Sequence, residues 1–74
     1  METELDWTEY AKGLLKAELK RRGLSYRDLA EKLGALGIHE TDRNIANKIS
    51  RGGFTAVFML QCLKAMGARE LRLD

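Results

Sequence analysis

Apolar residues recur at helical spacing along most of the chain, in four stretches that glycines separate. Residues three or four positions apart lie on the same face of a helix. In the first stretch, apolar residues at this spacing form a stripe, and lysines that recur every four residues lie on the opposite face. Gly23 follows three basic residues, a pattern typical of a left-handed helix end. The pattern therefore predicts a helix over about residues 7–22. Its stripe comprises Trp7, Ala11, Leu14, Leu15 and Leu19.

A second helix is predicted from Ser25 to about Leu36. Ser25 is placed to cap this helix, and Asp28, three positions later, completes a capping-box pattern. Two endings are compatible with the sequence: Gly34 ends the helix early, or the helix continues through Gly34 and ends at Gly37. The expected buried face consists of Leu29, Ala30, Leu33 and Leu36.

The third helix is predicted over about residues 41–51, with Thr41 as its N-cap and two glycines after its last residue. At 100° per residue, Ile45 and Ile49 share one side, which is expected to face the core. The opposite side holds arginine, asparagine and serine, and no carboxylate occurs from residue 43 to residue 53.

The fourth helix, about residues 55–66, is apolar on nearly every side. Such a helix is normally buried all round, and a small chain can hardly enclose one, so a second copy is expected to cover it. The tail, residues 68–74, alternates leucine with charge at the period of a strand. It is expected either to pair with the same tail across a twofold axis or to fray. The side chains expected at this dimer interface are Phe58, Met59, Cys62, Met66, Leu71 and Leu73.

The composition is that of one small globular domain spanning residues 1–74, of which residues 1–6 are expected to be flexible. One cysteine and one histidine exclude an internal disulfide and the usual four-ligand zinc site. No apolar run approaches the roughly 20 residues of a membrane span, and no phosphate loop or catalytic constellation indicates an enzyme. We therefore expect a cytoplasmic protein that uses no cofactor, metal or small-molecule substrate.

Charge is distributed unevenly in a chain whose net charge is only +2. Residues 11–27 hold six basic residues and one acidic residue, and residues 43–53 hold three basic residues and no acidic residue. If these two segments meet in space, they form a patch suited to an anionic polymer.

The run GLSYRDLAEKLG, residues 23–34, is followed by the polar IANKISRG, residues 45–52, and then by an apolar helix. This succession, over about residues 14–67, resembles the helix-turn-helix of the lambda-repressor-like (Cro/CI or Xre) family. The whole chain resembles a small, uncharacterised bacterial family of such domains. The resemblance implies a compact all-α bundle of four to five elements with a recognition helix at about residues 41–51. The turn before that helix, residues 34–40, is longer than is usual in the family.

The polar side of the third helix has the chemistry that the DNA major groove selects. Arginine can donate two hydrogen bonds to guanine and asparagine can pair twice with adenine, and the first residues of a recognition helix usually reach the bases. The expected base-reading residues are Arg43, Asn44 and Asn47. The expected phosphate contacts are Tyr26, Arg27, Lys48, Ser50 and Arg51.

The sequence thus favours a homodimeric, sequence-specific double-stranded DNA-binding protein that regulates transcription. The alternative is a helical protein-interaction module that binds through its apolar fourth helix and does not bind DNA.

Overall fold

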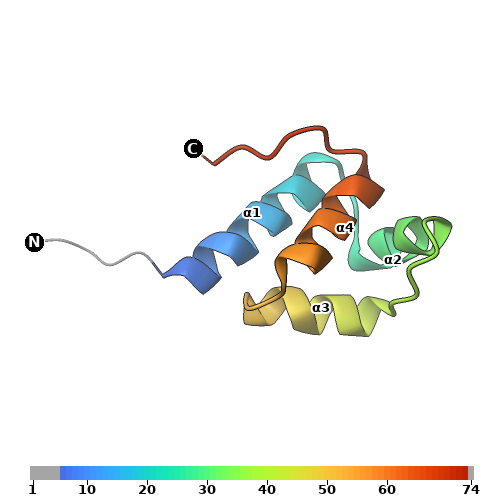
Figure 1. Ribbon diagram of the computed structural model, residues 1–74, viewed down its shortest axis with the longest axis horizontal. Helices are drawn as coiled ribbons and strands as arrows, with labels where there is room; N and C mark the ends of the chain where they lie inside the picture. Colours follow the sequence, from blue (N-terminus) through green and yellow to red (C-terminus); the bar gives the residue numbers. More distant parts are fainter. Residues whose placement is uncertain (1–5, 74) are drawn as a thin grey trace, which may run out of the picture.

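The computed structural model describes residues 6–73 and is a four-helix domain (Figure 1). Its helices are α1 (Trp7–Arg21), α2 (Tyr26–Ala35), α3 (Asp42–Arg51) and α4 (Ala56–Met66). The predicted all-α fold is confirmed, and each helix begins and ends within about a residue of its expected bounds. No strand occurs in the described part of the chain. Most of the segment expected to be flexible, residues 1–5, lies outside the described residues.

Short polar side chains begin the helices. The Ser25 hydroxyl accepts the backbone N–H of Asp28 at 3.1 Å, and the Asp28 carboxylate accepts the N–H of Ser25 at 2.9 Å, which completes the predicted capping box. Thr41 and Thr55 each accept a backbone N–H from the first turn of α3 and α4, at 3.1 and 3.0 Å. Asp6 caps α1 in the same way.

The ending of α2 follows the second of the two predicted patterns. The helix continues through Gly34, and the chain turns at Gly37, whose φ of 83° lies in the left-handed region. Leu36 therefore follows the last helical residue and is half exposed, which corrects its expected place on the buried face. Ile38 donates its N–H to the Leu33 carbonyl at 2.9 Å and packs partly against the core.

The core lies where α1 and α2 meet the other two helices. Both α3 and α4 pack against α1 and α2, and Figure 1 shows α3 along one edge of the molecule, below α1 and α4. Ile45 and Ile49 are fully buried, so they anchor α3 as predicted. None of the helices of residues 6–73 combines the length and apolar character that a membrane crossing requires.

The placement of α4 corrects part of the expected dimer interface. Phe58, Cys62 and Met66 expose only 4%, 0% and 8% of their surface and belong to the domain's own core. The helix is buried along one side because α1 and α2 cover it there. It exposes Val57 and Leu60, at 64% and 61%, on the other side.

The tail lies along its own chain. Of the two states expected for the tail, the strand does not occur within residues 68–73, and the Tyr10 hydroxyl donates to the Leu73 carbonyl at 2.5 Å. Leu71 packs partly against the core, whereas the Leu73 side chain is exposed. Trp7, expected on the buried stripe, is also exposed and meets the Tyr10 ring edge-on at 5.8 Å.

Glu18 is the one buried charged side chain among the described residues, with 3% of its surface exposed. Its carboxylate accepts hydrogen bonds from the Arg21 guanidinium at 2.7 Å and from the Arg22 guanidinium. Burial alone raises the pKa of Glu18, but the two guanidinium groups more than offset that effect and hold its pKa below the usual value of 4.5.

We expect Glu18→Gln to lower the free energy of unfolding at pH 7 by about 1–3 kcal/mol, since charged hydrogen bonds are lost inside the domain. Because the folded pKa is depressed, the stabilisation is present above pH 4.5 and is lost as the pH falls through the folded pKa. Thermal unfolding at pH 7 and pH 3 checks this, with exposed Glu31→Gln as the control. A difference between wild type and Glu18→Gln that does not shrink at pH 3 would contradict it.

Candidate nucleic-acid interface

The side of α3 that faces away from its two isoleucines forms an exposed polar surface. Every polar residue on it is exposed except Lys48, which is partly buried. We call this surface the α3 outer face. It comprises Arg43, Asn44, Asn47, Lys48, Ser50 and Arg51.

The three side chains expected to read bases have no structural role within the domain. Among residues 6–73, the side chains of Arg43, Asn44 and Asn47 make no hydrogen bond or ion pair. Asparagine is a poor helix former compared with glutamate or lysine, so two asparagines on an exposed helix side do not serve helix stability. The donors and acceptors of all three side chains are available to a ligand.

Lys48 holds α3 against the linker and α4. Its ammonium lies 2.6 Å from the Glu40 carboxylate and 4.8 Å from the centroid of the Phe58 ring. No pattern in the sequence predicts this contact, because Glu40 lies eight residues away in the linker between α2 and α3. One of the expected phosphate contacts therefore also has a structural role.

The C-terminal end of α3 is fixed to the start of α1. Gly52 has a φ of 72°, and a Cβ placed on it would lie 2.4 Å from the Thr8 carbonyl oxygen. The Lys12 ammonium donates to the Ser50 carbonyl at 3.2 Å. Together with the Lys48–Glu40 pair, these contacts set the angle of α3.

The hydrogen bond from Lys12 to Ser50 also joins the two basic segments, residues 11–27 and 43–53. The predicted basic patch required that these two segments lie close together. They do so at the contact between α1 and α3.

The first turn of α2 contributes the other two expected phosphate contacts. Arg27 is exposed there, and Tyr26 is half buried against the core. The neighbouring Asp28 stays charged, because its hydrogen bonds with the Ser25 backbone and hydroxyl lower its pKa.

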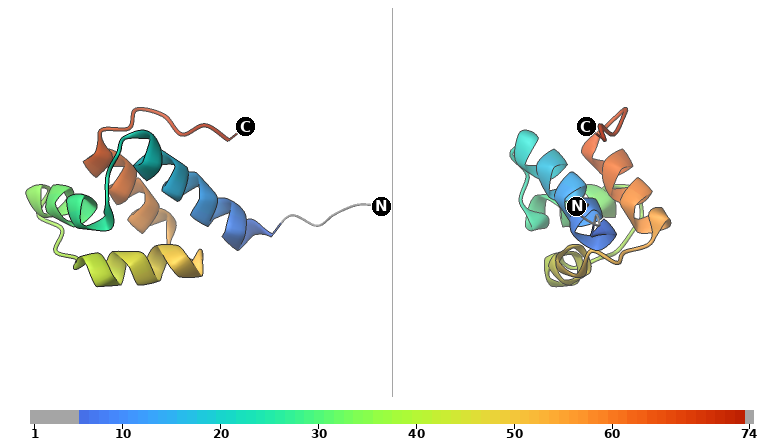
Figure 2. Two further views of the ribbon diagram at one scale, coloured as in Figure 1. Left: turned by 180° about the vertical axis from the view of Figure 1, so that it is seen from behind. Right: turned by 90° about the vertical axis from the view of Figure 1, so that its left-hand side faces the viewer.

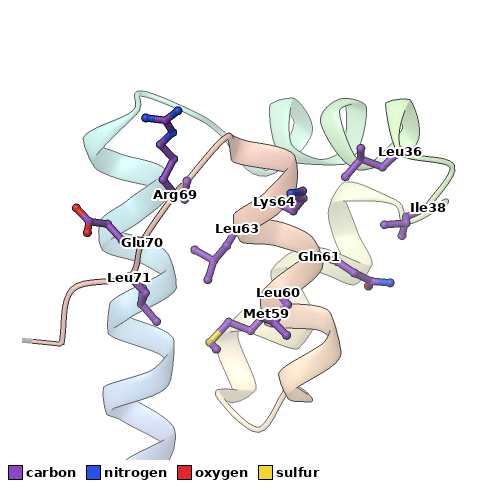
Figure 3. Close-up of a pocket in the computed structure, with 11 residues that line it drawn as sticks. Leu36, Ile38, Met59, Leu60, Gln61, Leu63, Lys64, Arg69, Glu70 and Leu71 are labelled. Carbon is purple, nitrogen blue, oxygen red and sulfur yellow. The ribbon is translucent and has the colours of Figure 1, made fainter.

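A second candidate surface is an apolar groove of about 560 Å³ along α4 (Figure 3). Figure 3 shows Leu36 and Ile38 on one side of α4, and Leu71 in the tail on the other. Met59 and Leu71, two of the expected dimer residues, line this groove, and exposed Leu60 adds to it. We call it the α4 groove.

Comparison with known families found a match over nearly the whole chain. The family described as "Domain of unknown function (DUF6471)" matches residues 7–71, from the first residue of α1 into the tail. The chain belongs to this family. The DUF6471 match includes both the α3 outer face and the α4 groove. No curated protein and no solved structure matched the chain.

Proposed function

We propose that this DUF6471 domain is a homodimeric, sequence-specific DNA-binding protein that regulates transcription in the bacterial cytoplasm. In this proposal α2 and α3 act as a helix-turn-helix of the lambda-repressor-like (Cro/CI or Xre) type, and α3 enters the major groove. The observation that carries the proposal is the α3 outer face. Its side chains Arg43, Asn44 and Asn47 are exposed without partners in residues 6–73, and no carboxylate lies between residues 43 and 53.

The proposed roles follow from side-chain chemistry. A helix of about 10–12 Å diameter fits the roughly 12 Å wide major groove of B-DNA. There Arg43 would donate to guanine O6 and N7, and Asn47 would pair with adenine N6 and N7. Asn44, in the first turn of α3, would contact a neighbouring base.

The phosphate contacts would come from both helices. Arg27 and Tyr26 lie in the first turn of α2, and Ser50 and Arg51 lie at the end of α3. Lys48 has three donors, of which Glu40 uses one, so it can hold the linker and still donate to a phosphate.

The fixed angle of α3 also supports the proposal. Base recognition requires side chains held in place by a rigid support. The Lys48–Glu40 pair ties the last turn of α3 to the linker that precedes the helix, and the close approach of Gly52 to Thr8 ties the same end to α1.

The experiment that tests the proposed function is selection of bound sequences from a random duplex pool, followed by titration of the selected duplex at several salt concentrations. The expected site is close to palindromic, with half-sites about one helical turn apart, and affinity should fall steeply with salt. A protein that binds no duplex at low salt would contradict the proposal.

The α4 groove supports self-association. It gathers exposed apolar side chains, including Leu36 and Leu60, that a second copy would remove from water. The same groove also favours the alternative function, a protein-interaction module without DNA binding. The duplex titration separates the two functions.

We expect Leu60→Glu to convert the dimer into a monomer, because a carboxylate in an apolar interface must lose its hydration. Sedimentation equilibrium at micromolar concentration should give a mass near twice the 8.4 kDa of the chain for the wild type and near 8.4 kDa for the variant. Ala56→Glu is the control, since Ala56 is exposed on α4 and does not line the groove. A monomeric wild type would overturn the proposed dimer.

A further inference from the structure

Three lysines follow one side of α1 at intervals of four residues: Lys12, Lys16 and Lys20. The row begins at the end of α3, where Lys12 donates to the Ser50 carbonyl at 3.2 Å. It ends at the start of α2. There Lys16 and Lys20 line a depression of about 430 Å³ together with Tyr26.

The row therefore borders both helices that the proposed function assigns to DNA. The rear view in Figure 2 shows α1, the start of α2 and α3 around one face of the molecule. Since α3 packs against both α1 and α2, this arrangement is fixed by the core.

The charge of the second and third lysines is not neutralised within the domain. Lys16 and Lys20 are exposed and make no hydrogen bond or ion pair with any residue from 6 to 73. Lys12 differs, because it also pairs with Glu9 at 3.1 Å. Glu18, the other acid of α1, is buried and held by two arginines of its own helix.

Three acids lie on the neighbouring helices α2 and α3: Asp28, Glu31 and Asp42. Asp28 is engaged in the capping box of α2, and Asp42 lies in the first turn of α3, whereas Lys12 meets the last turn of that helix. None of the three carboxylates makes an ion pair with Lys16 or Lys20.

We propose that Lys16 and Lys20 contact phosphates of the same duplex that α3 is proposed to read, and thus extend the interface onto α1. This inference rests on the proposed function. Side chains four residues apart on a helix are about 6 Å apart along its axis, and successive phosphates of one strand rise by about 3.4 Å along the duplex axis. The two lysines are thus far enough apart to contact separate phosphates, and the contact adds affinity without sequence discrimination.

The test is Lys16→Gln with Lys20→Gln, titrated at several salt concentrations against the selected duplex and against a scrambled duplex of equal length. The slope of log K against log salt should become shallower by about 3.6, since the dimer loses four phosphate contacts and each contributes about 0.9. Affinity should fall by a similar factor for both duplexes. Glutamine is a good helix former, so the melting temperature should stay within a few degrees of wild type.

The control is Lys32→Gln, which removes a charge from an exposed position on α2 outside the α4 groove and should keep the wild-type slope. If the Lys16 and Lys20 variant keeps the wild-type slope, or if the control loses as much, the inference is overturned and the proposed function stands. If the wild type shows no salt-dependent binding to either duplex, the proposed function itself fails and the inference fails with it.

Discussion

Replacing Arg43 and Asn47 together with alanine should abolish sequence-specific duplex binding and leave the fold intact. Both side chains are exposed and have no partner within residues 6–73, so their removal breaks no contact that holds the domain together. Each bidentate base contact discriminates by about 1–3 kcal/mol. The two together correspond to a loss of roughly 30-fold or more in affinity for the selected duplex, at about 1.4 kcal/mol per tenfold.

The measurement is a titration of wild type and double variant against the selected duplex and a scrambled duplex. The wild type should prefer the selected duplex, and the double variant should bind both with similar affinity. Lys32→Ala is the control, because it removes an exposed charge from α2, outside both the α3 outer face and the α4 groove. If the double variant still discriminates between the duplexes, the assignment of base reading to the α3 outer face is wrong.

Gly52→Ala should destabilise the domain by about 3 kcal/mol or more. An alanine there must adopt the left-handed conformation, at φ 72°, which costs about 1–2 kcal/mol for an L-residue. Its Cβ would also lie 2.4 Å from the Thr8 carbonyl oxygen, so the backbone of α1 or α3 must move. Both Lys12 and Ser50 belong to this junction, and their hydrogen bond would be lost with it.

Thermal unfolding checks this prediction. For a domain of this size, a loss of about 1 kcal/mol of stability lowers the melting temperature by roughly 4–8 °C. Gly52→Ala should therefore melt roughly 12 °C or more below the wild type. Its neighbour is the control. Gly53 has no positive φ and nothing within 4 Å of an added Cβ, so Gly53→Ala should melt near the wild-type temperature. Equal melting temperatures for the two variants would contradict the close approach of α3 to α1.

Local signals in the sequence predicted the helices well. Three helices have the expected N-cap residues, because a hydroxyl just before a helix can accept a hydrogen bond from a backbone N–H of the first turn. These residues are Ser25, Thr41 and Thr55. Gly52 and Gly67 end their helices in the left-handed conformation. These features depend on neighbours a few residues away, so they can be read from sequence without knowledge of the fold.

Features set by distant contacts could not be predicted. In α4, apolar residues occur on nearly every side, so periodicity could not separate Cys62, which is buried, from Leu60, which is exposed. The contact of Lys48 with Glu40 depends on the path of the linker after Gly37. The exposure of the α3 outer face was predicted correctly, because Ile45 and Ile49 lie on one side of the helix and that side alone is apolar enough to face the core. Its role in DNA binding stays a prediction.

The burial of Cys62 supplies a built-in probe of how often the core opens. It is the only cysteine in the sequence, and its side chain is fully buried in α4. Burial, helped by the nearby Glu40 carboxylate, raises the pKa of its thiol to about 12, so almost none of the reactive thiolate exists near neutral pH. An alkylating reagent can therefore modify the chain only after α4 has separated from α1 and α2. The alkylation rate then reports how often the native protein opens, without denaturant and without an engineered probe residue.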